Sequence, residues 1–146
     1  MIRKTENART AAELAKLLWP DHEVEALEAE ISRLIDDPDA AVFLAYQGET
    51  AVGFAQCQLR HDYVEGTESS PVGYLEGIFV KEEARGRGYA RLLLTACEVW
   101  AKEKGCTEFA SDCELENQES LRFHLKTGFE EAGRIICFTK KIGDQV

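Results

Sequence analysis

The spacing of apolar residues in the first forty positions predicts two amphipathic helices. Apolar side chains recur every three or four positions over residues 10–18 and again over residues 24–35, which places them on one face of each helix. Pro20 ends the first helix, and the acidic run 36–39 ends the second. A short opening strand is expected at residues 2–4.

The middle of the chain has the extended apolar runs that are typical of strands. Residues 41–46 and 51–59 flank a short Gly-containing turn and predict a β-hairpin. A polar loop, 60–72, follows; it is long for a compact domain, and such loops are often functional. Beyond it we expect strands at 73–80, 107–111 and 135–140, and helices at 89–104 and 117–126. This order predicts an α/β fold, a mixed sheet with helices on both faces, in a single domain that covers residues 1–146.

Composition limits the partners of the chain. Its 146 residues include 27 acidic and 17 basic side chains, a net charge of −10. This charge disfavours nucleic acid and suits a cationic partner, although acidic surfaces also serve solubility. No apolar run is long enough for a membrane span and no signal-peptide pattern is present, so we expect no membrane partner and a cytoplasmic location. The five cysteines lack zinc-site spacing, and no metal is expected.

A basic, glycine-rich turn lies between the predicted strand 73–80 and the predicted helix 89–104. It consists of Arg85, Gly86, Arg87, Gly88, Tyr89 and Ala90. Glycines at a helix N-terminus leave backbone N–H groups accessible to an anion, and the helix adds partial positive charge there. The third glycine of a dinucleotide fingerprint and the Lys-Ser/Thr pair of a Walker A loop are both absent. The residues alone therefore predict an anion site and leave open which anion it binds.

Signals in and after the turn together resemble the GNAT N-acetyltransferase superfamily. The turn is similar to that family's R/Q-x-x-G-x-G/A signature, Asn117 opens a later helix, and residues 125–130 are similar to its helix-ending K-x-G-F signature. The resemblance implies the GNAT acyl-CoA N-acyltransferase fold, with splayed central parallel strands, and acetyl-CoA as co-substrate. It places the pyrophosphate of coenzyme A on residues 85–90, and the pantetheine arm beside Asn117 and the backbone of Ile78, Phe79 and Val80.

Further segments are similar to the aminoglycoside 6'-N-acetyltransferases in particular. They are residues 18–20, 61–66, 69–72, 75–80, 105–108 and 110–112. This resemblance implies acetylation of the 6'-amine of kanamycin-type antibiotics, which confers resistance. Such substrates carry several ammonium groups, which carboxylates and aromatic faces bind. The substrate-binding residues that it implies are Trp19, Tyr63, Glu68, Glu76 and Asp112.

Two of these carboxylates are expected to serve catalysis. The attacking amine must lose a proton, and Asp112 and Glu76 can accept it directly or through water. Backbone N–H near Val80 would then stabilise the oxyanion. Structural roles are open as well: a core ring for Trp19 and a helix cap for Asp112.

Two positions depart from the family pattern. His124 stands where many superfamily members have a tyrosine as general acid, and Gly133 where the resembling enzymes often have an acidic residue. The loop that carries Tyr63 and Glu68 reaches a partner subunit's site in those enzymes, which implies a homodimer. Two other functions stay open: an acetyltransferase for another cationic amine, such as a polyamine or a protein lysine or N-terminus, and a non-catalytic acetyl-CoA-sensing module.

Overall fold

A computed structural model describes residues 1–143 of the protein. The chain forms two compact units, residues 1–112 and a second unit that begins at Cys113. The prediction of a single domain stays a prediction. Within residues 1–143, no helix is long and apolar enough to cross a membrane, and no cluster of His, Cys, Asp and Glu side chains could hold a metal ion.

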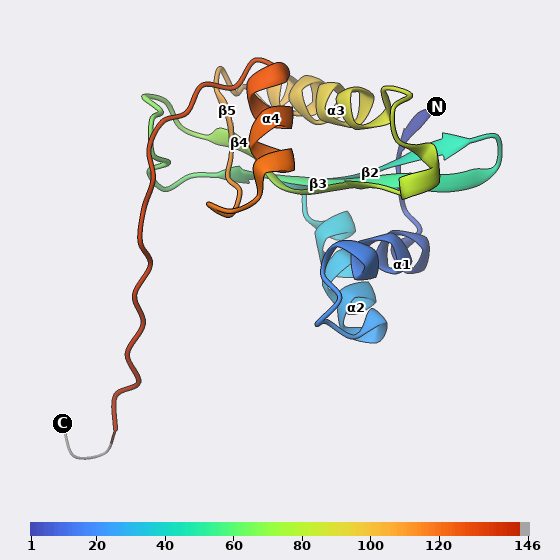
Figure 1. Ribbon diagram of the computed structural model, residues 1–146, viewed down its shortest axis with the longest axis horizontal. Coiled ribbons are helices and arrows are strands. Elements are labelled where there is room, and N and C mark those ends of the chain that lie inside the picture. Colours follow the sequence, from blue (N-terminus) through green and yellow to red (C-terminus); the bar gives the residue numbers. More distant parts are fainter. Residues whose placement is uncertain (144–146) are drawn as a thin grey trace. The chain divides into compact units, whose positions relative to one another are not determined.

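The first unit is a five-stranded sheet with helices on both faces (Figure 1). Its strands are β1 (Ile2–Lys4), β2 (Ala40–Gln47), β3 (Thr50–Arg60), β4 (Val72–Val80) and β5 (Phe109–Ser111). Its helices are α1 (Ala8–Leu18), α2 (Val24–Asp36), α3 (Tyr89–Glu103) and the single 3₁₀ turn η1 (Glu82–Ala84). The strands lie in chain order, β1 to β4 pair antiparallel, and β5 joins β4 in parallel. The predicted mixed α/β sheet is confirmed.

The apolar faces of the helices explain the layers. On one face of the sheet, Leu14 of α1 and Ile31 of α2 pack in one cluster with Leu44 and Phe54 of the strands. Helix α3 covers the other face (Figure 1). Helix α1 begins two residues earlier than its apolar pattern predicts, because the side chain of Asn7 caps it by accepting a hydrogen bond from an N–H of its first turn.

A β-bulge in β4 and the early end of its pairing with β5 shape one end of the sheet. Gln56 pairs with Gly77 and Cys57 pairs with Leu75, so Glu76 is the extra residue of a β-bulge. The parallel ladder with β5 covers Gly73 to Leu75 and stops there. Glu76 therefore lies where β4 and β5 part, as expected for the predicted splayed strands.

The second unit contains helix α4 (Gln118–Lys126) and an extended C-terminal segment. Asn117 caps the helix by accepting the N–H of Ser120 at 3.0 Å. The predicted strand at residues 135–140 is wrong for the single chain, since residues 129–143 form neither helix nor strand. A strand needs a hydrogen-bonding neighbour, and sequence pattern alone does not supply one. The large exposed apolar side chains of this segment are Ile135, Ile136, Phe138 and Ile142.

Candidate active site

A cavity of about 340 Å³ lies in the first unit, on the side of the sheet that faces α1 and α2. It is lined by Trp19, His22, Leu27, Glu30, Gln56, Gln58, Arg60 and Glu76. Alternate residues of a strand share one face, which explains why three polar side chains of β3 reach the same hollow. Trp19 and Glu76 were predicted as substrate-binding residues. The other six were missed, because their grouping depends on strand register and helix packing.

Trp19 forms one wall of the cavity where α1 ends. Its indole meets the ring of Phe54 edge-on, with centroids 6.1 Å apart. A Cβ atom on Gly77 would lie 2.7 Å from Cζ2 of Trp19, so the indole lies directly against the backbone of β4. The sequence left open whether Trp19 is a core residue or a substrate-binding residue. Its ring is placed for both roles, because it packs against Phe54 of the core and also lines the cavity.

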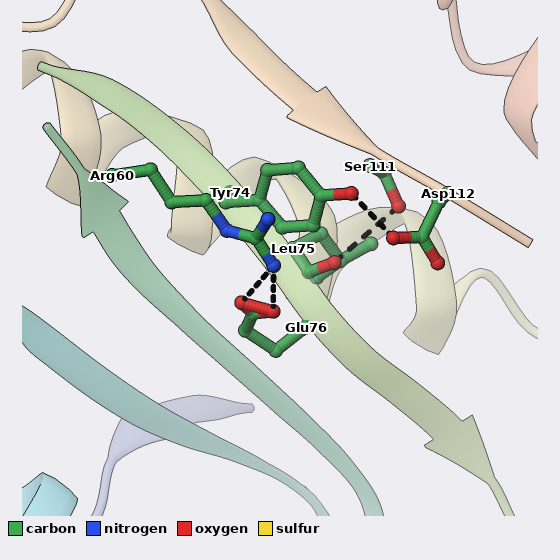
Figure 2. Close-up of polar contacts among 6 residues, drawn as sticks. All are labelled: Arg60, Tyr74, Leu75, Glu76, Ser111 and Asp112. Carbon is green, nitrogen blue, oxygen red and sulfur yellow. Dashed lines mark hydrogen bonds and ion pairs between the residues drawn. The ribbon is translucent and has the colours of Figure 1, made fainter. Parts of the chain in front are cut away.

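Glu76 is held by a paired arginine. The Nη2 atom of Arg60 donates to Oε1 of Glu76 at 2.7 Å and to Oε2 at 2.9 Å. Burial opposes the charge of Arg60, but the hydrogen bond and the charge of Glu76 outweigh it and raise the pKa of the guanidinium. The Arg60 side chain is 41% exposed and that of Glu76 only 16%. Figure 2 shows both side chains reaching across from neighbouring strands.

Tyr74 connects this ion pair to the second predicted carboxylate. Its ring lies beneath the guanidinium of Arg60, with Cζ 3.5 Å from the ring centroid, and its hydroxyl donates to the carboxylate of Asp112 (Figure 2). Burial and the hydrogen bond to Asp112 raise the pKa of Tyr74, so its phenol keeps its proton at neutral pH. Glu76, Arg60, Tyr74 and Asp112 therefore form one continuous polar chain.

Tyr63 and Glu68 lie elsewhere on the loop that follows β3. The loop is anchored by Val64, which packs in a buried cluster with Val72 and Tyr74. Tyr63 is 76% exposed, and the backbone N–H of Glu68 donates to Glu108 at 2.8 Å. Neither side chain lines the described cavity of the single chain. Their predicted substrate contacts stay predictions.

The turn at residues 85–90 is open along its backbone. Gly86 and Gly88 have φ values of +79° and +86°, and nothing lies within 4 Å of the Cβ position of either. Gly88 is the N-cap of α3, so the N–H groups of the first helical turn begin there. Arg85 has a structural role in this turn, because its Nε donates to the carbonyl oxygen of Val80 at 2.9 Å. The geometry suits a phosphate group held by backbone.

Two predicted residues belong to the second unit. Asn117 uses its side-chain oxygen as the cap of α4, and its predicted contact with pantetheine stays a prediction. The Nδ1 atom of His124 lies 2.7 Å from the carbonyl oxygen of Ser120, which can only accept, so this nitrogen carries a hydrogen. The ring also lies 5.0 Å from that of Phe129.

Comparison with known proteins identifies the family. Residues 11–129 match the model of the acetyltransferase (GNAT) family. The chain belongs to this family. Two similar relatives are each named aminoglycoside N(6')-acetyltransferase type 1. The protein from Stenotrophomonas maltophilia is 46% identical over 134 residues, 90% of this chain and 86% of the relative, and that from Salmonella typhimurium is 44% identical over 128 residues, 88% of each.

Solved structures agree with this membership. The aminoglycoside N-acetyltransferase AAC(6')-Iy in complex with CoA has a TM-score of 0.94 and 40% identity, over 97% of this chain and 95% of that one. The same enzyme with the bisubstrate analogue CoA-S-monomethyl-acetylneamine has a TM-score of 0.93 and 40% identity, over 97% and 98%. The predicted GNAT fold and the predicted family are confirmed.

Proposed function

We propose that the protein is an aminoglycoside 6'-N-acetyltransferase that moves acetyl from acetyl-CoA to the 6'-amine of kanamycin-type antibiotics. The observation that carries the proposal is the polar chain from Glu76 to Asp112 beside the indole of Trp19. Two carboxylates and an aromatic wall suit a sugar that carries several ammonium groups. The relatives named above, at 44% and 46% identity, support the same activity.

Acetyl-CoA would bind where β4 leaves β5. The backbone of Ile78, Phe79 and Val80 would hold the pantetheine arm, since the β5 ladder ends at Leu75. The open turn with Arg85, Gly86, Arg87, Gly88, Tyr89 and Ala90 would hold the pyrophosphate on its N–H groups. Asn117 would lie against the pantetheine arm.

The chemistry is a direct attack within a ternary complex. The ammonium of the bound sugar gives a proton to a carboxylate, and the neutral amine attacks the thioester carbonyl. The oxyanion is stabilised by the N–H of Val80. The C–S bond then breaks and coenzyme A leaves as thiolate, while the former amine nitrogen loses its second proton, which protonates the thiolate directly or through solvent. Asp112 is the better-placed base of the two carboxylates, because it accepts from the uncharged hydroxyl of Tyr74, whereas Glu76 is paired with a cation, Arg60 in the free protein and a substrate ammonium in the complex. Glu76 then orients the substrate.

We further propose that the protein acts as a homodimer in the cytoplasm, where acetyl-CoA is available. The exposed apolar side chains of the C-terminal segment, Ile135 and Phe138 among them, support a second copy as their cover. In such a dimer Tyr63 and Glu68 would contribute to the partner's acceptor site. Sedimentation should give twice the mass of the chain, and Phe138→Asp should shift it toward the monomer.

Thiol release from acetyl-CoA tests the activity. Kanamycin, tobramycin, spermine and a lysine peptide are offered separately, and we expect release with the two drugs. Turnover with spermine or the peptide alone would replace the proposal by an acetyltransferase for another amine. Binding of acetyl-CoA without turnover of any of them would favour a sensing module. Expression in a susceptible strain, compared with Asp112→Asn, tests the resistance phenotype.

A further inference from the structure

We propose that Arg60 is a specificity-determining residue that occupies the ammonium position of the acceptor site when no amine is bound. An amine would then bind at Glu76 only by displacing the guanidinium. This inference rests on the proposed function, because it concerns the same site. What is new is that Arg60, a residue of the protein itself, competes with the substrate amine for Glu76.

The contacts of Arg60 are those that an ammonium ligand would make. Its Nη2 atom reaches both carboxylate oxygens of Glu76, at 2.7 and 2.9 Å. Its Cζ atom lies 3.5 Å from the ring centroid of Tyr74, the distance of a close cation–π contact. A carboxylate and an aromatic face are what proteins offer to cationic amines, and here one side chain of the protein occupies both (Figure 2).

A second cation cannot join this arrangement unchanged. Glu76 is a single carboxylate with a largely buried side chain, 16% exposed. An ammonium group at hydrogen-bond distance from it would lie within a few ångströms of the guanidinium, and like charges at that distance repel. We expect this repulsion to drive one of the two cations out of the site.

Arg60 is the group that can move. It is the last residue of β3, its side chain is 41% exposed, and the polar loop begins directly after it. A guanidinium on a flexible stem can turn into solvent and regain its hydration there. Glu76, in contrast, is placed by the bulge of a paired strand.

The need to displace Arg60 lowers the affinity of every amine that binds at Glu76. Every amine that takes the position at Glu76 meets the same competitor, so its affinity falls by the same factor. Ligands with several ammonium groups regain affinity through Asp112 and through Glu30, which lines the same cavity. Ligands with one amine have no such compensation and stay weakly bound. The site would thereby spare small cellular amines from acetylation.

Equilibrium binding by calorimetry tests this directly. The probes are kanamycin, methyl 6-amino-6-deoxyglucoside with its single amine, and neutral methyl glucoside. In Arg60→Met we expect both amines to bind about tenfold more tightly, a change of about 1.4 kcal/mol, and the neutral sugar to bind as before. The KM of the single-amine sugar should fall by a similar factor at unchanged kcat.

Two further variants make the result specific. Arg9→Met removes the same charge from an exposed pair with Glu28 at 3.2 Å, and should change amine binding less than about twofold. Arg60→Lys keeps the charge but loses the planar guanidinium, and should give an intermediate gain. It also keeps the test informative if Arg60→Met unfolds, which thermal melting would reveal.

Unchanged or weaker amine binding in Arg60→Met and Arg60→Lys would overturn the proposal. So would a fall in kcat with amine affinity unchanged, which would show that Arg60 only positions Glu76. One further result would distinguish a failure of the proposed function from a failure of the competitor role of Arg60. If the wild type fails to acetylate kanamycin while Arg60→Met still binds the single-amine sugar more tightly, the proposed function is wrong and the competitor role stands.

Discussion

The acceptor site and the turn at residues 85–90 are built by different parts of the chain. The acceptor site consists of side chains that hold one another in pairs, Glu76 with Arg60 and Tyr74 with Asp112. The turn consists of backbone, kept open by Gly86 and Gly88. A site made of backbone depends on conformation at a few positions. A site made of side chains depends on strand register, and its side chains bond to one another. A substitution of one of them therefore alters the positions of the others.

The largest effect is expected at the proposed base. Asp112→Asn keeps the shape of the side chain but removes its capacity to take a proton, so kcat/KM for kanamycin should fall by about 10²- to 10⁴-fold. Steady-state thiol release measures it. Asp36→Asn removes a charge from the exposed end of α2 and should leave the rate unchanged. A loss below about threefold in Asp112→Asn would transfer the role of base to another group.

The turn should respond to a change of backbone conformation alone. Gly88→Ala forces a residue with a Cβ atom into a φ of +86°, at a cost of about 1–2 kcal/mol. If the turn shifts to relieve this strain, the Kd for acetyl-CoA should rise by about tenfold and amine binding should stay as it was. Gly48→Ala imposes similar strain at a φ of +64° in the hairpin turn and should affect stability only. Equal acetyl-CoA affinity in all three proteins would argue against a phosphate site on this turn.

Gly77→Ala tests the acceptor site through packing. The new methyl group would lie 2.7 Å from Cζ2 and 2.8 Å from Cη2 of Trp19, so the indole has to move. Overpacking of this kind costs about 1–3 kcal/mol. We expect a lower Tm and a higher KM for kanamycin, with an unchanged Kd for acetyl-CoA. Gly143→Ala, which has open space around it, is the control, and an equal Tm in both variants would contradict the close approach.

The same contrast explains how far the sequence could predict the molecule. The turn at residues 85–90 and the amphipathic helices depend on local pattern, and both were predicted. The end of α1 at Trp19 was also predicted, because Pro20 follows it, whereas the substrate contact of Trp19 stays a prediction. These features need no knowledge of which strand lies beside which.

The missed features all depend on partners that are distant in sequence. The bulge at Glu76 exists only in the pairing of β3 with β4, so the sequence of β4 alone does not show it. Arg60 gains its role from two residues of the next strand. The predicted strand at 135–140 has the composition of a strand, but pairing requires a neighbour, and a linear sequence does not provide it.

The smallest effect is expected from Tyr74→Phe, and its size depends on pH. Burial and the hydrogen bond to Asp112 raise the pKa of Tyr74 above its ordinary value of 10.0, so the folded protein retains this proton more firmly than the unfolded chain. The resulting stability is fully present below about pH 10 and is lost as the pH rises further toward the folded pKa. Wild-type Tm should therefore fall more steeply than that of Tyr74→Phe between about pH 10 and about pH 12. Below pH 9 the variant should be less stable by about 0.5–1.5 kcal/mol, the contribution of one hydrogen bond. A Tm difference that stays constant across this range would mean that the Tyr74 hydroxyl does not donate to Asp112 in solution, and the link between the ion pair and the proposed base would be lost.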